Sequence, residues 1–282
     1  DSRERKELMQ RYDMSAFDRM FVWHGDYRLI VAIIKYIEDK MNVADDVASV
    51  GVQCIILVED SVSFYSSYLP LLYTEIFMQS RRLIAEGMNL THKFLRMRAR
   101  PKILLCSTYE EAWSYFERYE EYVLGVISDI DFLRNGKKDP NAGVEFAQAV
   151  KARKDDIPIL LQSSNADARE VAQKVGVSFL QKRSPTLLHD LSAFVKKNFG
   201  FGDFVFRMPD GTEVGRATNL RELEEQLQAV PDACIQYHAE RNHFSNWLKA
   251  RTVLQFVVKE EPCHTISSFA VEPSSMARMS QS

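Results

Sequence analysis

Polar residues with reactive side chains follow several short apolar runs in the middle of the chain. Glu59 and Asp60 follow "QCIILV", Asp129 follows "YVLGVIS", Ser163 ends "IPILLQS", and Lys182 ends "VSFLQK". If these runs are parallel strands of one sheet, their carboxyl ends meet at one edge, and the three carboxylates crowd together there. A hard divalent cation relieves that repulsion, and Mg²⁺ fits because it prefers oxygen ligands and works beside phosphate. The pattern therefore predicts a magnesium site beside a hydroxyl and an amine.

This set of groups suits the transfer of a phosphoryl group onto a carboxylate. Asp129 would attack as the nucleophile, and Mg²⁺ would neutralise charge on the transferred group. Ser163 and Lys182 would hold the phosphoryl oxygens once the acyl phosphate has formed. Asp131, two residues beyond Asp129, places a further negative charge next to the acceptor.

Five apolar runs alternate with helical patterns between residues 51 and 198, with helices expected over 108–119, 143–153, 167–175 and 186–198. The runs are continuously apolar rather than alternating, which is typical of parallel strands covered on both faces. Strict alternation of strand and helix predicts an α/β fold with a doubly wound sheet.

Both flanks of this unit have patterns of their own. Residues 20–40 predict a strand, a loop and an apolar helix, and they weakly repeat the pattern around Lys182, with His24 in the position of the lysine. We therefore expect residues 1–45 to be a strand–helix remnant of a preceding domain of the same kind, or an extra helix that packs on the central one. Residues 199–257 predict a small α+β module.

Within that module we expect a hairpin turning at Pro209-Asp210-Gly211, a helix from Leu220 to Ala229, a strand "ACIQYH" and a helix "HFSNWLKAR". Residues 258–282 lose periodicity and gain Ser and Pro, so we expect a disordered tail. His238 and His243 lack a third ligand of suitable spacing, which favours packing over metal binding.

The strand-end motifs "IILVED", "VISDIDF", "IPILLQSS" and "SFLQK" resemble those of response-regulator receiver domains over residues 51–198. The resemblance implies a flavodoxin-like five-stranded parallel sheet of order 2-1-3-4-5. It also implies a phosphoacceptor, Asp129, and a Mg²⁺ site. The implied metal ligands are Glu59, Asp60, Asp129 and the main-chain carbonyl of Asp131, and the implied switch and phosphoryl-binding residues are Ser163, Lys182 and Phe179.

Three features depart from the receiver pattern. Arg183 follows the lysine where receivers usually have proline, Asp131 adds charge, and the segment between Asp60 and Ile103 is longer than the usual first helix. We expect an extended helix there, kinked at Pro70. The basic insertion, residues 81–102, could dock an acidic partner or nucleic acid, but a solvated basic helix face is the favoured interpretation.

A wider resemblance links the flanking segments "VWHGDYRLIVAIIKYIED" and "YHAERNHFSNWLKAR" to the regulatory part of bacterial proteins that join receiver-like domains to a phosphoenolpyruvate synthase or pyruvate phosphate dikinase type enzyme. The implied output partner is such an enzyme, fused or separate. Nothing in the chain resembles the catalytic half, so no separate enzymatic activity is expected, and the chain reads as a fragment of a longer protein.

The function expected from these residues is two-component signal transduction. A histidine kinase or phosphotransfer protein would supply the phosphoryl group, and the phosphorylated domain would switch a partner-binding surface. One alternative is a pseudo-receiver that acts as an interaction module without phosphorylation. A haloacid dehalogenase-type phosphatase is less favoured, because that family's Asp-x-Asp ends its first strand, whereas here Asp129 ends the third.

The composition is that of an ordinary globular protein, and it fits a cytoplasmic setting. The chain has 282 residues, a net charge of −3 and a pI near 6.1, which argues against general nucleic-acid binding. Its four cysteines form no CxxC pair and suggest a reducing compartment. The longest apolar segment is too short for a membrane span, and no GxGxxG or P-loop motif precedes a helix.

Overall fold

The central unit is an open sheet of five parallel strands in the order β2-β1-β3-β6-β7. The computed structural model describes residues 17–85 and 100–251. The strands are β1 (Cys54–Val58), β2 (Lys102–Cys106), β3 (Val123–Asp129), β6 (Ile159–Ser163) and β7 (Ser178–Gln181). Every residue of β1, β2 and β3 is buried, which explains why the apolar runs are continuous. The predicted flavodoxin-like order 2-1-3-4-5 is confirmed.

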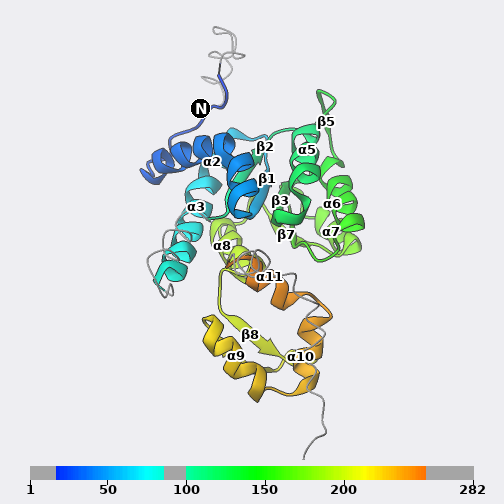
Figure 1. Cartoon of the computed structure of the whole chain (residues 1–282). Coiled ribbons are helices and arrows are strands. Elements are labelled where there is room, and N and C mark those ends of the chain that lie inside the picture. The colour runs from blue at the N-terminus through cyan, green and yellow to red at the C-terminus, as the bar shows by residue number, and fades with distance from the viewer. Residues whose placement is uncertain (1–16, 86–99, 252–282) are drawn as a thin grey trace, which may run out of the picture.

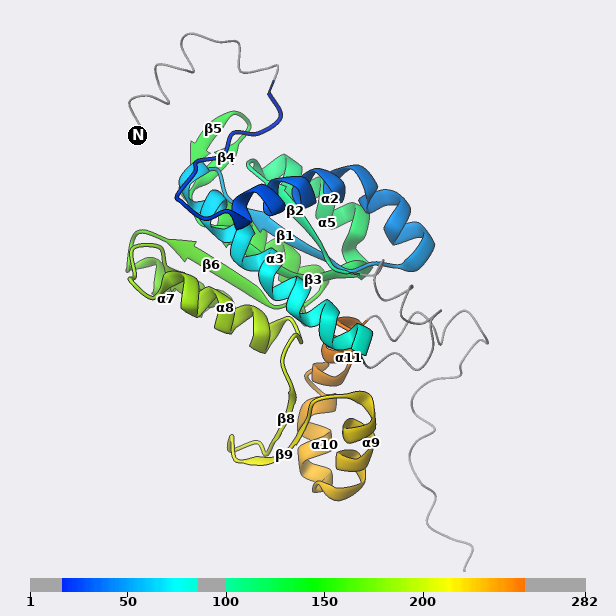
Figure 2. The ribbon, with the colours of Figure 1, turned by 90° about the vertical axis from the view of Figure 1, so that its left-hand side faces the viewer.

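Helices cover both faces of this sheet (Figures 1 and 2). One face packs against α3 (Val62–Ala85) and α8 (Leu187–Asn198) through Ile55, Leu57 and their neighbours. The other face packs against three helices through Ile56, Val58 and their neighbours. These helices are α5 (Tyr109–Tyr119), α6 (Ala142–Arg153) and α7 (Ala168–Val175). A 3₁₀ turn, η2 (Glu120–Tyr122), joins α5 to β3. All four helices predicted between the strands are present.

The extended first helix is also present, since α3 has 24 residues and continues through Pro70. The basic insertion is only partly within the described residues, which exclude 86–99. Two of its basic residues are not part of a solvated face. Arg100 and Lys102 are buried and form ion pairs with carboxylates of the preceding helix, at 2.6 Å to Asp39 and 2.6 Å to Asp46 respectively.

That preceding helix, α2 (Arg28–Val50), packs on α3 and along β2, which is an edge strand. The buried Asp39 carboxylate accepts a hydrogen bond from the backbone N–H of Ile103. A side chain of α2 therefore takes the place of a neighbouring strand as the partner of this edge N–H group. The strand predicted around Phe21 does not form. Residues 17–27 instead hold their position through individual contacts such as that from Val22 N–H to Ser66 Oγ.

A short hairpin after β3 was not predicted. It consists of β4 (Phe132–Arg134) and β5 (Lys137–Asp139), which pair in antiparallel fashion. Asn135 and Gly136 connect them with φ of 51° and 72°. Positive φ at both central residues is the requirement of a type I′ turn, for which Asn-Gly is the preferred sequence.

The C-terminal module begins with the predicted hairpin, β8 (Phe204–Arg207) and β9 (Glu213–Ala217), followed by α9 (Leu220–Ala229) and ending in α11 (His243–Lys249). The predicted strand "ACIQYH" is wrong, because these residues lie in α10 (Asp232–Ala239). Pro231 precedes the helix and Asp232 lies in its first turn, and both are favoured at a helix start. The module packs on the central unit at α11, where Asn246 Nδ2–H donates to the carbonyl of Asp156 at 3.4 Å.

The first sixteen residues and the predicted disordered tail, 258–282, lie outside the described residues. Among the described helices, none has both the length and the apolar character that crossing a bilayer requires.

Candidate functional site

Three carboxylates meet at the carboxyl ends of two neighbouring strands. Glu59 follows β1 directly, Asp60 comes next, and Asp129 is the last residue of β3. One oxygen from each lies within 4.8 Å of the others. Glu59 and Asp129 are buried, and Asp60 is half-buried. The convergence that the sequence predicts is therefore present in the fold.

Lys182, which follows β7, reaches across β6 to this carboxylate cluster. Its ammonium nitrogen lies 2.6 Å from Glu59 Oε2 and 2.6 Å from Asp129 Oδ2, and its side chain is only 3% exposed. Its backbone N–H donates to the carbonyl of Ser163, which fixes the start of the loop that follows β7. A buried ammonium placed between two buried carboxylates compensates part of the cost of removing all three charges from water.

The backbone holds the Asp129 carboxylate in a defined orientation. Asp129 Oδ1 accepts a hydrogen bond from Ile130 N–H at 2.8 Å, and Ser128 Oγ donates to the Asp129 carbonyl at 2.7 Å. Gly143, near the start of α6, packs directly on this turn. A Cβ atom there would lie 2.1 Å from the Asp129 carbonyl oxygen, so only glycine allows this close approach.

Burial raises the pKa of two carboxyl groups of this cluster. It raises the pKa of Glu59 to about 7, because its effect exceeds the opposing attraction of Lys182, and the negative charge of Asp129 adds to the rise. Burial also raises the pKa of Asp129, again against the attraction of Lys182. A cation placed among these oxygens would favour their ionised forms.

The donor set of the carboxylate cluster fits a hard divalent cation. All three side chains supply oxygen, which is the ligand that Mg²⁺ prefers. Glu59, Asp60 and Asp129 are the residues that would hold such an ion. The predicted contribution of the Asp131 main-chain carbonyl stays a prediction.

Lys138 is a charged residue of this site that the sequence-based prediction missed. It extends from β5, and its ammonium nitrogen lies 3.2 Å from Asp60 Oδ2 and 3.8 Å from Asp131 Oδ1. The nearby carboxylates, Asp60 first among them, raise the pKa of Lys138 against the opposing effect of burial. The dipeptide Asn135-Gly136 signals the hairpin that places this lysine, so the sequence did contain the information.

The two predicted switch residues are at the expected strand positions but outside the cluster's contacts. Ser163 ends β6, and its Oγ accepts a hydrogen bond from Asn165 N–H at 3.1 Å. Phe179 on β7 is 9% exposed, and the Arg169 guanidinium lies 5.2 Å from the centre of its ring. The phenylalanine is thus packed inward in this structure.

Helix α3 adds two aromatic residues that no motif indicated. The Lys182 ammonium lies 4.6 Å from the centre of the Phe64 ring, and Tyr68, one turn further on, is fully buried. The Tyr68 hydroxyl has no hydrogen-bond partner among the described residues. Burial raises its pKa, and the charges of Glu59 and Asp129 add to that effect. The extended helix therefore closes the apolar side of the site.

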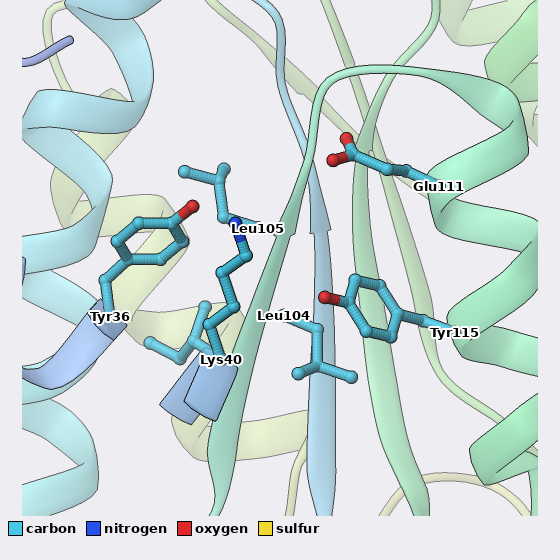
Figure 3. Close-up of a pocket in the computed structure, with 7 residues that line it drawn as sticks. Tyr36, Lys40, Leu104, Leu105, Glu111 and Tyr115 are labelled. Carbon is cyan, nitrogen blue, oxygen red and sulfur yellow. The ribbon is translucent and has the colours of Figure 1, made fainter. Parts of the chain in front are cut away.

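A separate hollow lies between α2, β2 and α5 (Figure 3). It has a volume of about 10 Å³, which is room for about one water molecule. The hollow is lined by the polar side chains of Tyr36, Lys40 and Glu111 and by four further residues, Ile103, Leu104, Leu105 and Tyr115. None of these residues belongs to the carboxylate cluster, and the hollow is too small for a ligand.

Comparison with solved structures finds response-regulator receiver domains over about half of the chain. A receiver domain protein from Clostridium thermocellum aligns at 16% identity with a TM-score of 0.33, and the alignment covers 52% of this chain and 94% of that one. The phosphorylated cyanobacterial phytochrome response regulator RcpA aligns at 16% identity and a TM-score of 0.33, covering 57% and 98%. Vibrio cholerae CheY4 aligns at 16% identity and a TM-score of 0.31, covering 52% and 98%.

No family model and no curated protein matches the chain. The comparisons give no support to the resemblance with phosphoenolpyruvate synthase-linked proteins, which stays a prediction. The fold assignment rests on the sheet order observed in this structure.

Proposed function

We propose that the chain is the phosphoacceptor of a two-component relay and receives a phosphoryl group on Asp129 from a histidine kinase or phosphotransfer protein. The observation that carries this proposal is the meeting of Glu59, Asp60 and Asp129 within 4.8 Å, at the carboxyl edge of a 2-1-3-4-5 sheet. In open α/β sheets this edge is where ligands bind. The setting that fits such a relay is the cytoplasm.

The transfer conserves atoms and charge in a simple way. A carboxylate oxygen of Asp129 forms a bond to phosphorus while the bond from phosphorus to the donor's histidine nitrogen breaks, and that nitrogen keeps the electron pair. Bound Mg²⁺ would neutralise charge on the phosphoryl oxygens. No substrate is turned over, so we propose no enzymatic activity beyond the gain and loss of this group.

Lys182 is placed to hold the product. Its ammonium is 2.6 Å from Asp129 Oδ2, and it would pair with a phosphoryl oxygen attached at that position. The hydroxyl of Ser163 is held by Asn165 N–H in this structure, so a rotation of its side chain would be needed to reach the phosphoryl group.

The output we propose is a change of packing around Phe179 and along α7, β7 and α8. A shift of Ser163 towards Asp129 would move the end of β6, the strand that pairs with β7, and β7 carries Phe179. A face with two alternative packings is the usual means by which a small change at a phosphorylated group alters partner binding. A phosphoenolpyruvate synthase-like enzyme is the output partner that the sequence suggests.

One observation favours the second candidate, a pseudo-receiver without phosphorylation. Lys182 pairs with Glu59 and Asp129, and Lys138 pairs with Asp60, so two ammonium groups already offset most of the charge of the three carboxylates. With the carboxylates paired in this way, the domain could stay folded without a metal ion and act as a protein-interaction module.

Incubation with a small-molecule phosphodonor and Mg²⁺, followed by intact mass measurement, separates the two candidates. We expect the wild-type chain to gain one phosphoryl group. The Asp131→Asn variant should gain it as well, and the Asp129→Asn variant should not. If the folded wild-type chain gains no phosphoryl group, or if Asp129→Asn is labelled equally, the receiver proposal is contradicted and the pseudo-receiver is favoured.

A further inference from the structure

Helix α2 is apolar on two sides, and only one of them is covered. Its buried side, which includes Leu29, Tyr36 and Val43, packs on the central unit. Its other side carries a row of exposed large apolar side chains, which we call the outer stripe. The outer stripe consists of Tyr27 (74% exposed), Ile30 (57%), Ile34 (52%), Ile37 (47%) and Met41 (73%).

The spacing of the outer stripe is that of a helix–helix interface. Its residues follow one another at intervals of three, four, three and four, which is the repeat that keeps a seam facing a partner helix. No polar residue interrupts the stripe. A contiguous row of exposed apolar side chains on a helix that otherwise carries charges marks a contact with another protein surface. Among the described residues nothing covers the stripe, and Figure 2 shows α2 on the outside of the central unit.

From this geometry we propose that the outer stripe is the interface of a homodimer, in which α2 packs antiparallel against α2 of a second copy. A two-fold axis between Ile34 and Ile37 makes the stripe complementary to itself. It brings Ile34 of one copy against Ile37 of the other, and Ile30 against Met41. Every large side chain of the stripe's centre then meets another apolar side chain.

The exposed area of the outer stripe is large enough for contact with a second copy of the chain. With the neighbouring Val31, the outer stripe exposes on the order of 700 Å² of side chain per copy, close to the ~800 Å² per partner of a standard specific interface.

The first test is the mass of the full chain in solution, measured by light scattering and sedimentation up to concentrations well above the micromolar range. We expect a dimer. Ile34→Glu with Ile37→Glu should raise the dissociation constant at least about thirtyfold, because charge at the centre of an apolar seam removes its strongest contacts. Both residues are exposed in one copy, so the variant should stay folded, which circular dichroism would verify.

The matched control places the same charges on exposed apolar residues elsewhere. Val171→Glu with Leu188→Glu changes α7 and α8, where the two side chains are 39% and 42% exposed, and should leave the dimer intact. A monomer at all concentrations, a dimer that the α2 variant leaves intact, or a dimer that the control variant dissociates equally well overturns the proposal.

A second test determines the direction of packing. Chains with Ile34→Cys are mixed with chains with Ile37→Cys, both in a Cys263→Ser background, and oxidised. We expect the mixed disulfide dimer to exceed both like-with-like dimers. Preferential crosslinking of Ile34→Cys to itself would indicate parallel helices and contradict the antiparallel interface. Neither test depends on phosphorylation of Asp129.

Discussion

At the scale of single residues, the site is a balance between buried acids and two lysines. The positions of Glu59, Asp60, Asp129 and Lys182 could be predicted because each ends or follows an apolar run, and parallel strands bring such ends together. Lys138 could not be placed by this logic, since a hairpin rather than the sheet brings it to the site.

Lys138 should compete with a divalent cation for Asp60. We expect Lys138→Ala to bind Mg²⁺ about three- to tenfold more tightly than the wild-type chain, because it removes an exposed ion pair of roughly 1 kcal/mol and a repelling positive charge. Titration calorimetry with Mg²⁺ measures this directly. The neighbouring Lys137, on the same hairpin, is the matched control. Weaker Mg²⁺ binding in Lys138→Ala than in Lys137→Ala would mean that Lys138 supports the metal site.

The raised pKa of Glu59 predicts how stability depends on pH in the absence of divalent cations. Its folded-state pKa of about 7 exceeds the ordinary value of 4.5, so the folded chain binds more protons between these two values. The free energy of unfolding should therefore fall as pH rises from about 4.5 to 7 and level off above that. Glu59→Gln should flatten this part of the curve. Chemical unfolding at each pH in EDTA measures it, and an unchanged slope in the variant would contradict the assignment.

At the scale of elements, the prediction succeeded where one physical rule decides the outcome. Continuous apolar strands and their following helices were predictable because both faces of a parallel sheet are covered. Helix α10 was mistaken for a strand because six residues are too few for their periodicity to distinguish the two. The strand predicted before α2 does not form, because a strand must pair with another strand. The outer edge of β2, where it could pair, is already covered by α2.

Asp39 links α2 to that edge and should be important for stability. Besides its contact with Ile103 N–H, its carboxylate accepts from the Tyr73 hydroxyl at 2.9 Å and pairs with the Arg100 guanidinium. Asp39→Asn would leave Arg100 without its buried partner, which costs about 3–5 kcal/mol. Asp45→Asn, on the exposed side of the same helix, should change stability little. Urea unfolding compares the two, and equal effects would show that the network is not stabilising.

At the scale of the whole molecule, the C-terminal module is joined to the central unit at α11. Asn246 Nδ2–H donates to the carbonyl of Asp156, and the Lys249 ammonium lies 4.0 Å from the Asp156 carboxylate. The module has its own aromatic core, in which Phe204 stacks on Phe244 at 4.7 Å between ring centres. The turn residues of the hairpin predicted where the module begins. No sequence pattern indicated where the module packs on the central unit.

The module should lose stability in mild acid because of His238. Burial lowers the pKa of His238 to about 4, with His243 contributing, whereas its ordinary value is 6.5. The unfolded module therefore binds more protons between these values, and stability should decline as pH falls from about 6.5 to 4. Fluorescence of Trp247 in a Trp23→Phe, Trp113→Phe background follows the module alone. A Trp247 unfolding midpoint that stays constant over this range would contradict a neutral buried His238.

Asp129 is the proposed phosphoacceptor, and the position of the acyl phosphate in the chain distinguishes it from the neighbouring carboxylates. Borohydride reduces an aspartyl phosphate to homoserine, which peptide mass spectrometry can locate after treatment with phosphodonor and Mg²⁺. We expect homoserine at position 129, and none when Mg²⁺ is replaced by EDTA. Homoserine at position 60 or 131 instead, or none at all in a folded chain, would contradict it.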